Sequence, residues 1–239
     1  MSKGGGGGGA SAATAPGTAG GWSDAAMRAV GINPDTIDPE DLEVMQRLGY
    51  RPEDISDLAG RGENGTMRIF AVDDGDGGAE ITISVSDPRL EGQSVRSIVH
   101  EPNGNKYIYN QNFVLKQEFR GRGIGRSMLQ QQVGAAQRMG INEIRTDATR
   151  GAGLTGYYAW ASLGYNAELS SADIASLSSR ARAAGTALPR NLGSISDVHG
   201  LFATPGGREL WKQHGFTKTM SFDTRRGSTS NRMLNARRR

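Results

Sequence analysis

Apolar residues in the first quarter of the chain recur at the spacing of an α-helix. Between residues 22 and 60, one apolar stripe stops at Gly49, a residue type that often ends helices. Asp38 followed by Pro39 is typical of a helix start, because aspartate can cap the first turn and proline suits its first position. The stripe consists of Leu42, Met45 and Leu48. We therefore expect a small acidic segment of short helices over residues 22–62.

The period then changes to the alternation of β-strands. Two alternating runs flank DDGDGG, which is a hairpin turn signal, and further β-like runs follow up to residue 223. The expected strands are Met67–Val72, Ile81–Asp87, Ser94–His100, Tyr107–Leu115, Glu143–Thr149 and Phe216–Asp223. Helical patterns interrupt them at Arg126–Met139 and Thr155–Tyr165. This order predicts an α/β fold, with a mixed, mainly antiparallel sheet and helices on both faces.

Both ends of the chain and one internal stretch depart from this pattern. Residues 1–21 hold nine of the 35 glycines and no apolar run, so we expect a disordered Gly/Ala-rich tail and no secretory signal. Within a main domain over residues 63–223, residues 166–207 are expected to be an insertion with a helix at Ser171–Ala184. Residues 224–239 carry six arginines and no acid, which predicts a solvated tail or an anchor for nucleic acid or an acidic protein.

Composition excludes several kinds of site. The chain has no cysteine, which rules out disulfides, thiolate metal sites and cysteine nucleophiles. The three histidines are too scattered for a metal site, so no metal is expected. No apolar run reaches the length of a membrane span, and we expect a cytoplasmic protein without membrane contact.

Charge is unevenly distributed behind a net value of +3. Residues 22–80 hold 14 acidic and 5 basic residues, whereas residues 81–239 hold 22 basic and 11 acidic ones. The basic part suits an anionic ligand such as coenzyme A, and it suits nucleic acid equally well. The two parts are also expected to attract each other.

The run RGRGIG, Arg120–Gly125, is the most informative chemical signal in the chain. It lies between the expected strand Tyr107–Leu115 and the expected helix Arg126–Met139. Glycines at such a turn allow backbone N–H groups to approach an anion, and the helix N-terminus adds a partial positive charge. The run therefore predicts a phosphate-binding loop, with an ordinary glycine turn as the alternative.

Two common nucleotide loops fit this run poorly. A Walker A loop ends in Gly-Lys-Ser or Gly-Lys-Thr, whereas Gly125 is followed by Arg126 and Ser127. A dinucleotide loop needs G-x-G-x-x-G, whereas Gly121, Gly123 and Gly125 are evenly spaced by two. Neither Mg-bound triphosphate nor dinucleotide binding is indicated.

The spacing R/Q-x-x-G-x-G/A resembles the loop of the GNAT superfamily of acyl-CoA N-acyltransferases. Three residues meet it: Arg120, Gly123 and Gly125. EIRTDAT at Glu143–Thr149 is similar to the fifth strand of that family, and TGYYAWASLGY at Thr155–Tyr165 to its last helix. The resemblance covers roughly residues 67–165, with the closing strand displaced by the insertion.

The resemblance implies where acetyl-CoA would bind. In the family, backbone amides of the loop hold the pyrophosphate of the coenzyme, and a backbone N–H of the fourth strand binds the thioester oxygen. That strand segment corresponds to Asn112–Val114, with Val114 as the implied residue. The implied loop residues are Arg120, Gly121, Arg122, Gly123, Ile124, Gly125 and Arg126.

The catalytic side chains are less clear. The usual tyrosine position of the family, four residues before the glycine of Leu-Gly-aromatic, holds Trp160, whose indole N–H cannot donate a proton near neutral pH. Tyr157, three residues earlier on the same helical face, is the candidate general acid, with a core aromatic as the alternative. No carboxylate occupies the expected strand as a base, Glu118 beside the loop is expected to be solvated, and a water-mediated base stays open.

Three functions compete. The leading one is an acetyl-CoA-dependent N-acyltransferase that acts on a primary amine. The first alternative is a catalytically degenerate GNAT-fold protein, serving as a structural or docking component of a viral particle or mobile-element assembly in the host cytoplasm or virion. The second is a nucleic-acid-binding protein that uses the basic half. The intact loop favours the enzyme, whereas the unclear acid and base favour the first alternative.

Overall fold

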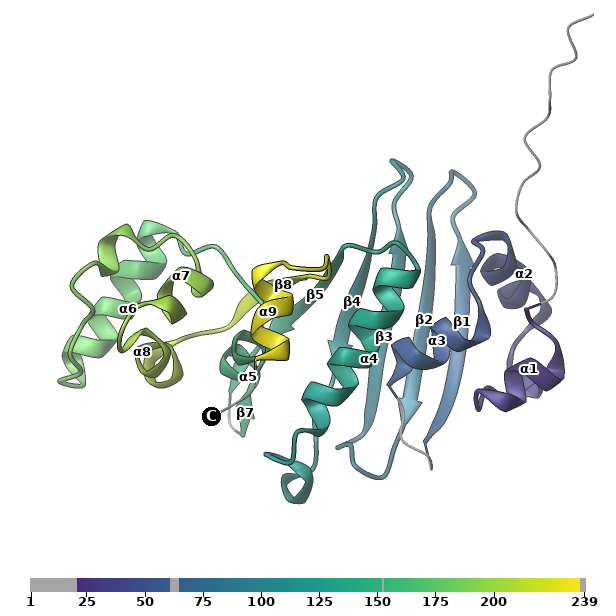
Figure 1. Ribbon diagram of the computed structural model, residues 1–239, viewed down its shortest axis with the longest axis horizontal. Coiled ribbons are helices and arrows are strands. Elements are labelled where there is room, and N and C mark those ends of the chain that lie inside the picture. The colour runs from purple at the N-terminus through teal and green to yellow at the C-terminus, as the bar shows by residue number, and fades with distance from the viewer. Residues whose placement is uncertain (1–20, 61–64, 152, 237–239) are drawn as a thin grey trace, which may run out of the picture.

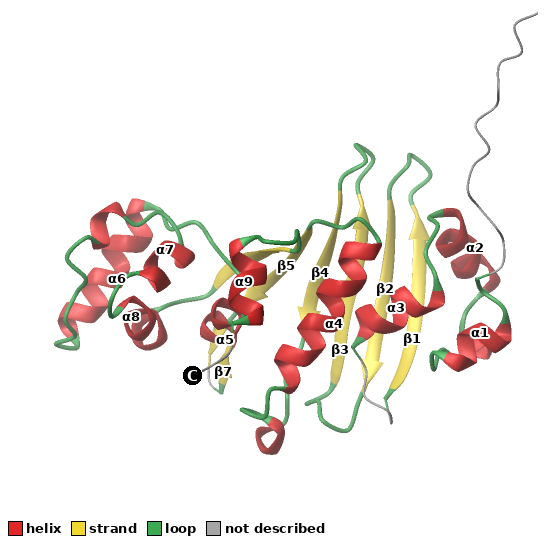
Figure 2. Ribbon diagram, viewed as in Figure 1, coloured by secondary structure: helices red, strands yellow, loops and turns green. Residues whose placement is uncertain are grey.

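A mixed six-stranded sheet forms the centre of the computed structural model, which describes residues 21–60, 65–151 and 153–236 (Figure 2). Its strands follow the order β1-β2-β3-β4-β5-β8, and every neighbouring pair is antiparallel except β4 and β5. The strands are β1 (Thr66–Asp73), β2 (Ala79–Ser86), β3 (Gln93–His100), β4 (Lys106–Asn112), β5 (Glu143–Ala148) and β8 (Lys218–Asp223). Two further short strands, β6 (Arg150–Gly151) and β7 (Leu154–Thr155), form a separate ribbon.

Helices lie across one face of this sheet and around both of its ends (Figure 1). Figure 1 shows α3, α4 and α9 across the face, α1 and α2 beyond β1, and α6, α7 and α8 beyond β8. The α-helices are α1 (Asp24–Ala29), α2 (Pro39–Arg47), α3 (Pro52–Ala59), α4 (Ile124–Arg138), α5 (Gly156–Ser162), α6 (Ser171–Ala183), α7 (Val198–Ala203), α8 (Gly207–His214) and α9 (Thr229–Asn235). The short 3-10 turns are η1 (Pro34–Thr36), η2 (Gln117–Phe119) and η3 (Leu192–Ser194).

The alternation of side chains along the strands decides which face is covered. In β2, Ile81, Ile83 and Val85 are buried on the helix-covered face, because successive side chains of a strand point to opposite faces. On the other face, Phe70 and Val72 of β1 are 52% and 65% exposed. By register that face also carries Glu80, Thr82, Tyr107, Tyr109, Arg145 and Asp147, all exposed or half-buried. The α/β class and the mixed, mainly antiparallel sheet are confirmed, whereas the helices gather on one face and leave this open face uncovered.

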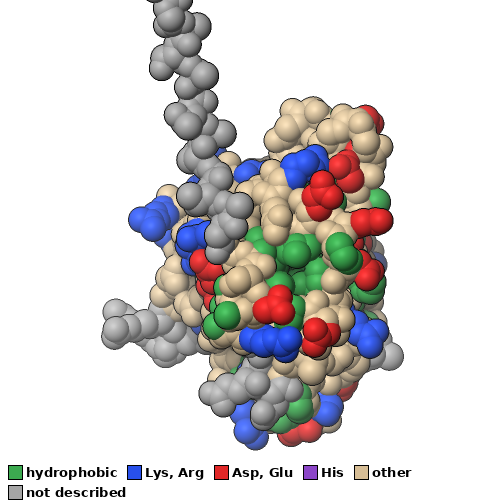
Figure 3. Space-filling view, turned by 90° about the vertical axis from the view of Figure 1, so that its right-hand side faces the viewer, with side chains coloured by type: hydrophobic (Ala, Val, Ile, Leu, Met, Phe, Trp, Pro, Cys, Tyr) green, Lys and Arg blue, Asp and Glu red, His purple; other side chains and the backbone are tan. Residues whose placement is uncertain are grey.

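The acidic N-terminal helices pack on the same core as the sheet. The side chain of Ser23 caps α1 by accepting a hydrogen bond from the amide of Ala26, and Trp22 and Met45 belong to the buried core. The carboxylate of Asp41 on α2 accepts a 2.8 Å hydrogen bond from the amide of Ala71 at the edge of the sheet. The molecular surface at this end shows a group of apolar side chains with acidic and basic ones around it (Figure 3).

The expected attraction between the acidic and basic parts is seen where α3 meets α4. Arg138 of α4 pairs with Asp54 at 2.7 Å and with Asp57 at 2.6 Å. Asp54 is itself buried, so its charge is compensated by Arg138 and by Arg51. The N-terminal helices are therefore an integral layer of the fold.

Helices α6, α7 and α8 follow α5 in the chain, and α8 carries Trp211. Trp211 of α8 is fully buried, and its indole Nε1 donates a 2.9 Å hydrogen bond to the carbonyl of Tyr157 in α5. Its ring also lies against Phe216, which follows α8. One large aromatic side chain thus connects α8 to α5.

The C-terminal segment corrects one expectation from the sequence. Residues 224–236 are not a solvated tail, because α9 packs against β8 and α4 with Leu234 only 1% exposed. Ser228 caps α9, and the guanidinium of Arg126 in α4 donates to the carbonyl of Leu234 at the other end of α9. The expectation of a solvated tail rested on the six arginines and overlooked Leu234, whose apolar side chain packs in the core. The expected N-terminal tail and the last three arginines lie outside the described residues, apart from Gly21.

Within the described ranges, none of the helices combines the length and the apolar character needed to cross a membrane.

Candidate functional site

The two parallel strands of the sheet separate in the middle of the molecule. β4 and β5 pair only from Ile108 with Ile144 to Asn110 with Thr146. Just beyond, Asn110 and Asn112 lie opposite adjacent residues of β3, so Gln111 is the extra residue of a β-bulge. A bulge bends its strand and interrupts pairing. The structure therefore opens a gap in the sheet directly after Asn110.

A cavity of about 520 Å³ occupies this gap. The end of β4, the loop before α4, the end of β5 and helix α5 surround it. Six of the residues expected to bind the coenzyme line it: Val114, Arg120, Gly121, Gly123, Gly125 and Arg126. The sequence-predicted loop and the strand gap thus belong to one site.

The glycine loop adopts the backbone that its sequence predicts. Gly121 and Gly123 have φ values of +75° and +81°, a left-handed region that only glycine adopts without strain. Gly123 is the N-cap residue of the 15-residue helix α4, and its carbonyl accepts the first helical hydrogen bond, from the amide of Ser127. The glycines therefore turn the chain sharply from the strand into the helix.

A row of backbone N–H groups is left without protein acceptors by this turn. Among the described residues, no acceptor is seen for the amides of Gly121, Arg122, Gly123, Ile124 and Gly125. The first N–H groups of a helix have no intrahelical partner, and they carry the positive end of the helix dipole. Such a group of amides is a ready binding site for an anion.

The two arginines of the cavity wall are engaged with the protein. Arg120 donates through Nε to the carbonyl of Leu115 at 2.8 Å and pairs with Glu91 at 3.4 Å. Arg126 donates to carbonyls at the end of α9. Both guanidinium groups hold the loop and its neighbours in place, while adding positive charge to this end of the cavity.

The backbone beyond β4 determines which amide faces the gap. The carbonyl of Val114 accepts a 2.8 Å hydrogen bond from Glu91, on the β3 side, whereas the carbonyl of Leu115 accepts from Arg120. Peptide groups of an extended chain alternate in direction from one residue to the next. We therefore infer that the amide of Phe113, rather than that of Val114, points toward β5.

Tyr157, the candidate acid, lies outside the cavity wall. Its hydroxyl donates to the carbonyl of Lys212 in α8, and its ring packs against Trp211 with 6.4 Å between ring centroids. Tyr158 and Trp160 line the cavity instead. Tyr157 is buried toward α8 because Trp211 and Lys212 supply its partners, which helical spacing within α5 alone could not show.

Asp147 at the end of β5 is a cavity residue that the sequence reasoning missed. Its carboxylate accepts hydrogen bonds from the hydroxyls of Tyr109 at 2.5 Å and Thr219 at 2.7 Å. These two hydrogen bonds hold the pKa of Asp147 below its usual value, against a small opposing effect of burial. Asp147 is the one acidic side chain among the described residues of the cavity wall. The sequence signal that could have identified it is the position of this acidic residue near the end of the expected strand Glu143–Thr149.

Ser162 contributes a second polar group to the cavity wall. It ends α5 and is 7% exposed, and its Oγ has no hydrogen-bond partner among the described residues. Ser178 in α6, by contrast, donates to the carbonyl four residues earlier at 2.8 Å. Serine hydroxyls in helices commonly donate a hydrogen bond to a carbonyl of the preceding turn in this way. The hydroxyl of Ser162 thus remains available within the protein interior.

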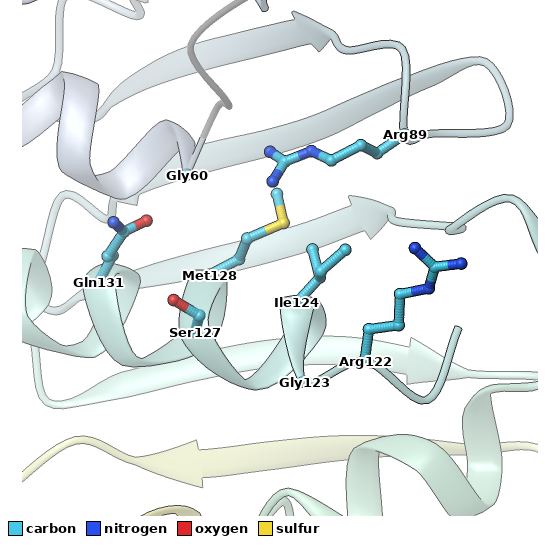
Figure 4. A pocket seen from close by; sticks show the side chains of 8 residues that line it. All are labelled: Gly60, Arg89, Arg122, Gly123, Ile124, Ser127, Met128 and Gln131. Atoms are coloured by element: carbon cyan, nitrogen blue, oxygen red, sulfur yellow. The ribbon is translucent and has the colours of Figure 1, made fainter. Parts of the chain in front are cut away.

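A smaller cavity of about 300 Å³ lies beside α4 (Figure 4). Arg122 and Ile124, the other two residues expected at the coenzyme site, line this cavity together with Arg89, and Gly123 borders both cavities. Arg89 is neutralised by Asp87 at 2.7 Å. The residues of the loop thus line two cavities, which share Gly123.

Each of the three histidines makes a hydrogen bond within the protein. His199 contacts the carbonyl of Gly164 at 2.9 Å, and His214 contacts the hydroxyl of Thr186 at 2.8 Å. His100 lies beside the hydroxyl of Tyr50. In the described part of the chain, no group of three or more His, Asp or Glu side chains is arranged to hold a metal ion.

Comparison with known proteins adds little to this geometry. No protein-family model and no curated protein matches the sequence. The crystal structure of a nourseothricin acetyltransferase is similar at 15% sequence identity, over 64% of this chain and 68% of that chain, with a TM-score of 0.31. A TM-score this low does not establish a common fold, so the function has to be argued from the site itself.

Proposed function

We propose that the protein is an N-acyltransferase that takes an acyl group from acetyl-CoA. The observation that carries the proposal is the row of five amides, Gly121–Gly125, for which no acceptor is seen among the described residues. Gly121, Gly123 and Gly125 line the larger cavity, and Arg122 and Ile124 line the smaller cavity beside it. A pyrophosphate would accept hydrogen bonds from these amides and gain from the dipole of α4. The resemblance of the loop to the GNAT pattern supports the same ligand.

The rest of the cavity suits the arm of the coenzyme. From the loop, the cavity runs along Phe113, Trp160 and Leu163, which offer an apolar surface to an uncharged chain. The thioester would then lie in the gap between β4 and β5. There the amide of Phe113 would donate to the thioester oxygen and stabilise the negative charge that develops on it during attack.

The proposed reaction requires no general acid or general base from the protein, because water can exchange both protons. A neutral amine attacks the thioester carbon, a C–N bond forms, and the C–S bond breaks with the electron pair leaving on sulfur. The nitrogen releases its proton to water, and the thiolate takes a proton from water. Tyr157 has no part in this proposal, because its hydroxyl donates to the carbonyl of Lys212.

Calorimetry with acetyl-CoA tests the binding site through Gly125→Val. Gly125 has an ordinary φ, and an added Cβ would lie 3.6 Å from Phe113, so the variant should fold while its side chain fills the loop. We expect affinity to fall at least about tenfold, or 1.4 kcal/mol. Gly123→Val is a poorer test because its φ of +81° strains any other residue.

Gly134→Val is the matched control, since it places the same residue in α4 away from the cavity. Its affinity for acetyl-CoA should equal that of the wild type. Absence of binding by the wild-type protein, or unchanged affinity in folded Gly125→Val, would overturn the proposed ligand.

A second candidate is a protein that binds acyl-CoA without transferring the acyl group. It is favoured by the scarcity of proton donors, because the described cavity wall holds no histidine, lysine or glutamate, and Tyr158 is its one tyrosine. A thiol-reactive dye separates the two functions. The chain contains no cysteine, so any signal with acetyl-CoA and an amine reports released coenzyme.

A further inference from the structure

Charge is segregated along the larger cavity. Arg120, Arg126 and the amides of Gly121, Gly123 and Gly125, which have no acceptor among the described residues, lie at the loop end, whereas Asp147 lies at the end of β5. The nearest cation on the same face of β5, Arg145, already pairs with Glu143 at 2.8 Å and stacks on Tyr107. Among the described residues, Asp147 has hydroxyl partners but no ion pair. The cavity therefore offers a positive end and a negative end.

The carboxylate of Asp147 is suited to binding a cation rather than removing a proton. Two hydroxyl groups donate to it, from Tyr109 and Thr219, and this stabilises the ionised form. A general base works best when its pKa is near the working pH, so a carboxylate that remains ionised is a weak base. An ionised carboxylate at a cavity wall attracts an ammonium group instead.

Access to Asp147 comes from the open face of the sheet. Thr146 and Asp147 are consecutive in β5, so their side chains point to opposite faces, yet both line the cavity. The cavity thus passes through the sheet at the gap. Tyr109 lies on the open face beside Asp147, while the glycine loop precedes α4 on the covered face. Two molecules could enter from opposite sides.

We propose that Asp147, held by Tyr109 and Thr219, binds a second, cationic group of the acceptor amine, so that the acceptor is a diamine or polyamine. This inference rests on the proposed function. The attacking nitrogen must be neutral, so the ammonium that pairs with Asp147 is a different one and keeps its charge throughout. The C–N bond forms and the C–S bond breaks as before, with protons exchanged with water.

Two amines of the same length test the inference. Release of coenzyme from acetyl-CoA is followed with 1,5-diaminopentane and with 1-aminopentane, which lacks the second charge. For the wild type, we expect kcat/KM to be roughly 10- to 100-fold higher for the diamine, the value of one charge-assisted hydrogen bond. Asp147→Asn should remove this preference, so that kcat/KM for the diamine falls to about the value for the monoamine. The preference should also shrink with added salt.

Tyr109→Phe and Thr219→Val keep the carboxylate but remove one hydroxyl each, so they should reduce the preference in part. Acetyl-CoA affinity and melting temperature of all three variants serve as controls for folding and for the loop. A wild type without preference for the diamine, or Asp147→Asn that retains it, would overturn the role of Asp147. So would a coenzyme-loaded protein that neither acetylates nor binds either amine in calorimetry. Failure of the wild type to bind acetyl-CoA would instead overturn the proposed function.

Discussion

Trp211 decides where the side chain of Tyr157 lies. Its indole donates to the carbonyl of Tyr157, and the hydroxyl of Tyr157 donates to Lys212, the next residue of α8. The two hydrogen bonds connect α5 to α8 in both directions. A hydroxyl that already has a partner inside the protein contributes to stability, and its proton is directed away from the reacting atoms.

Tyr157→Phe separates this structural role from a catalytic one. We expect the free energy of unfolding to fall by about 0.5–1.5 kcal/mol, because the carbonyl of Lys212 loses its donor. Turnover should be unchanged. Chemical denaturation and the coenzyme-release assay measure the two effects. A loss of kcat of about 10²–10⁴ with unchanged stability would restore Tyr157 as the general acid.

At the scale of elements, α6 is attached to the edge of the sheet by its first turn. Ser170 and Asp173 form a capping box, in which each side chain bonds the backbone N–H of the other residue. Asp173 also pairs with Lys218 of β8 at 2.8 Å. Burial raises the pKa of Asp173, but the hydrogen bonds from Lys218 and Ser170 outweigh it and hold the pKa below its usual value.

Asp173→Asn should therefore show a stability difference that depends on pH. The carboxylate contributes fully above its ordinary pKa, and its contribution is lost as the pH falls through the lowered folded-state value. At pH 7 we expect the variant to be less stable by about 1 kcal/mol. The difference from wild type should narrow below about pH 4 and disappear at lower pH. Unfolding curves from pH 7 to pH 2 measure it, and a constant difference would contradict the assignment.

At the scale of the whole molecule, the C-terminus supports the cavity wall. α9 buries Leu234, and carbonyls at its end accept from the guanidinium of Arg126, which lines the larger cavity. Two of the arginines counted in the expected basic tail are also engaged locally. Arg225 pairs with Asp223 at 2.7 Å, and Arg232 donates to Thr229 at 2.9 Å. The C-terminal segment is thus held against the first turn of α4 by the hydrogen bonds between α9 and Arg126.

Removal of residues 227–239 should consequently destabilise the protein and weaken acetyl-CoA binding. Removal of a solvated tail would leave stability unchanged, whereas loss of the buried Leu234 alone should cost about 2–5 kcal/mol, as for other buried leucines. Thermal unfolding and calorimetry measure the two effects. Truncation after Ala236 is the control and should leave both unchanged. A stable, ligand-binding protein without α9 would show that its packing is dispensable.

Local patterns were sufficient for most elements. The helix predicted at Arg126–Met139 is α4 (Ile124–Arg138), and the strand predicted at Ser94–His100 is β3 (Gln93–His100). The glycine loop was predicted for the same reason, because the need for positive φ at Gly121 and Gly123 belongs to a few consecutive residues. Hydrophobic period and turn chemistry act over short distances, so one sequence contains them.

The sequence by itself determined the strands, the helices and the loop with its row of amides. Only the tertiary structure decided which side chains face the cavity, because those contacts join residues far apart in the chain. Tyr109 and Asp147 are 38 positions apart, Tyr157 and Lys212 are 55 apart, and Arg126 and Leu234 are 108 apart. No local period encodes such pairs. They arise when buried apolar residues such as Trp211 and Leu234 bring distant elements together, and the polar groups beside them then find partners.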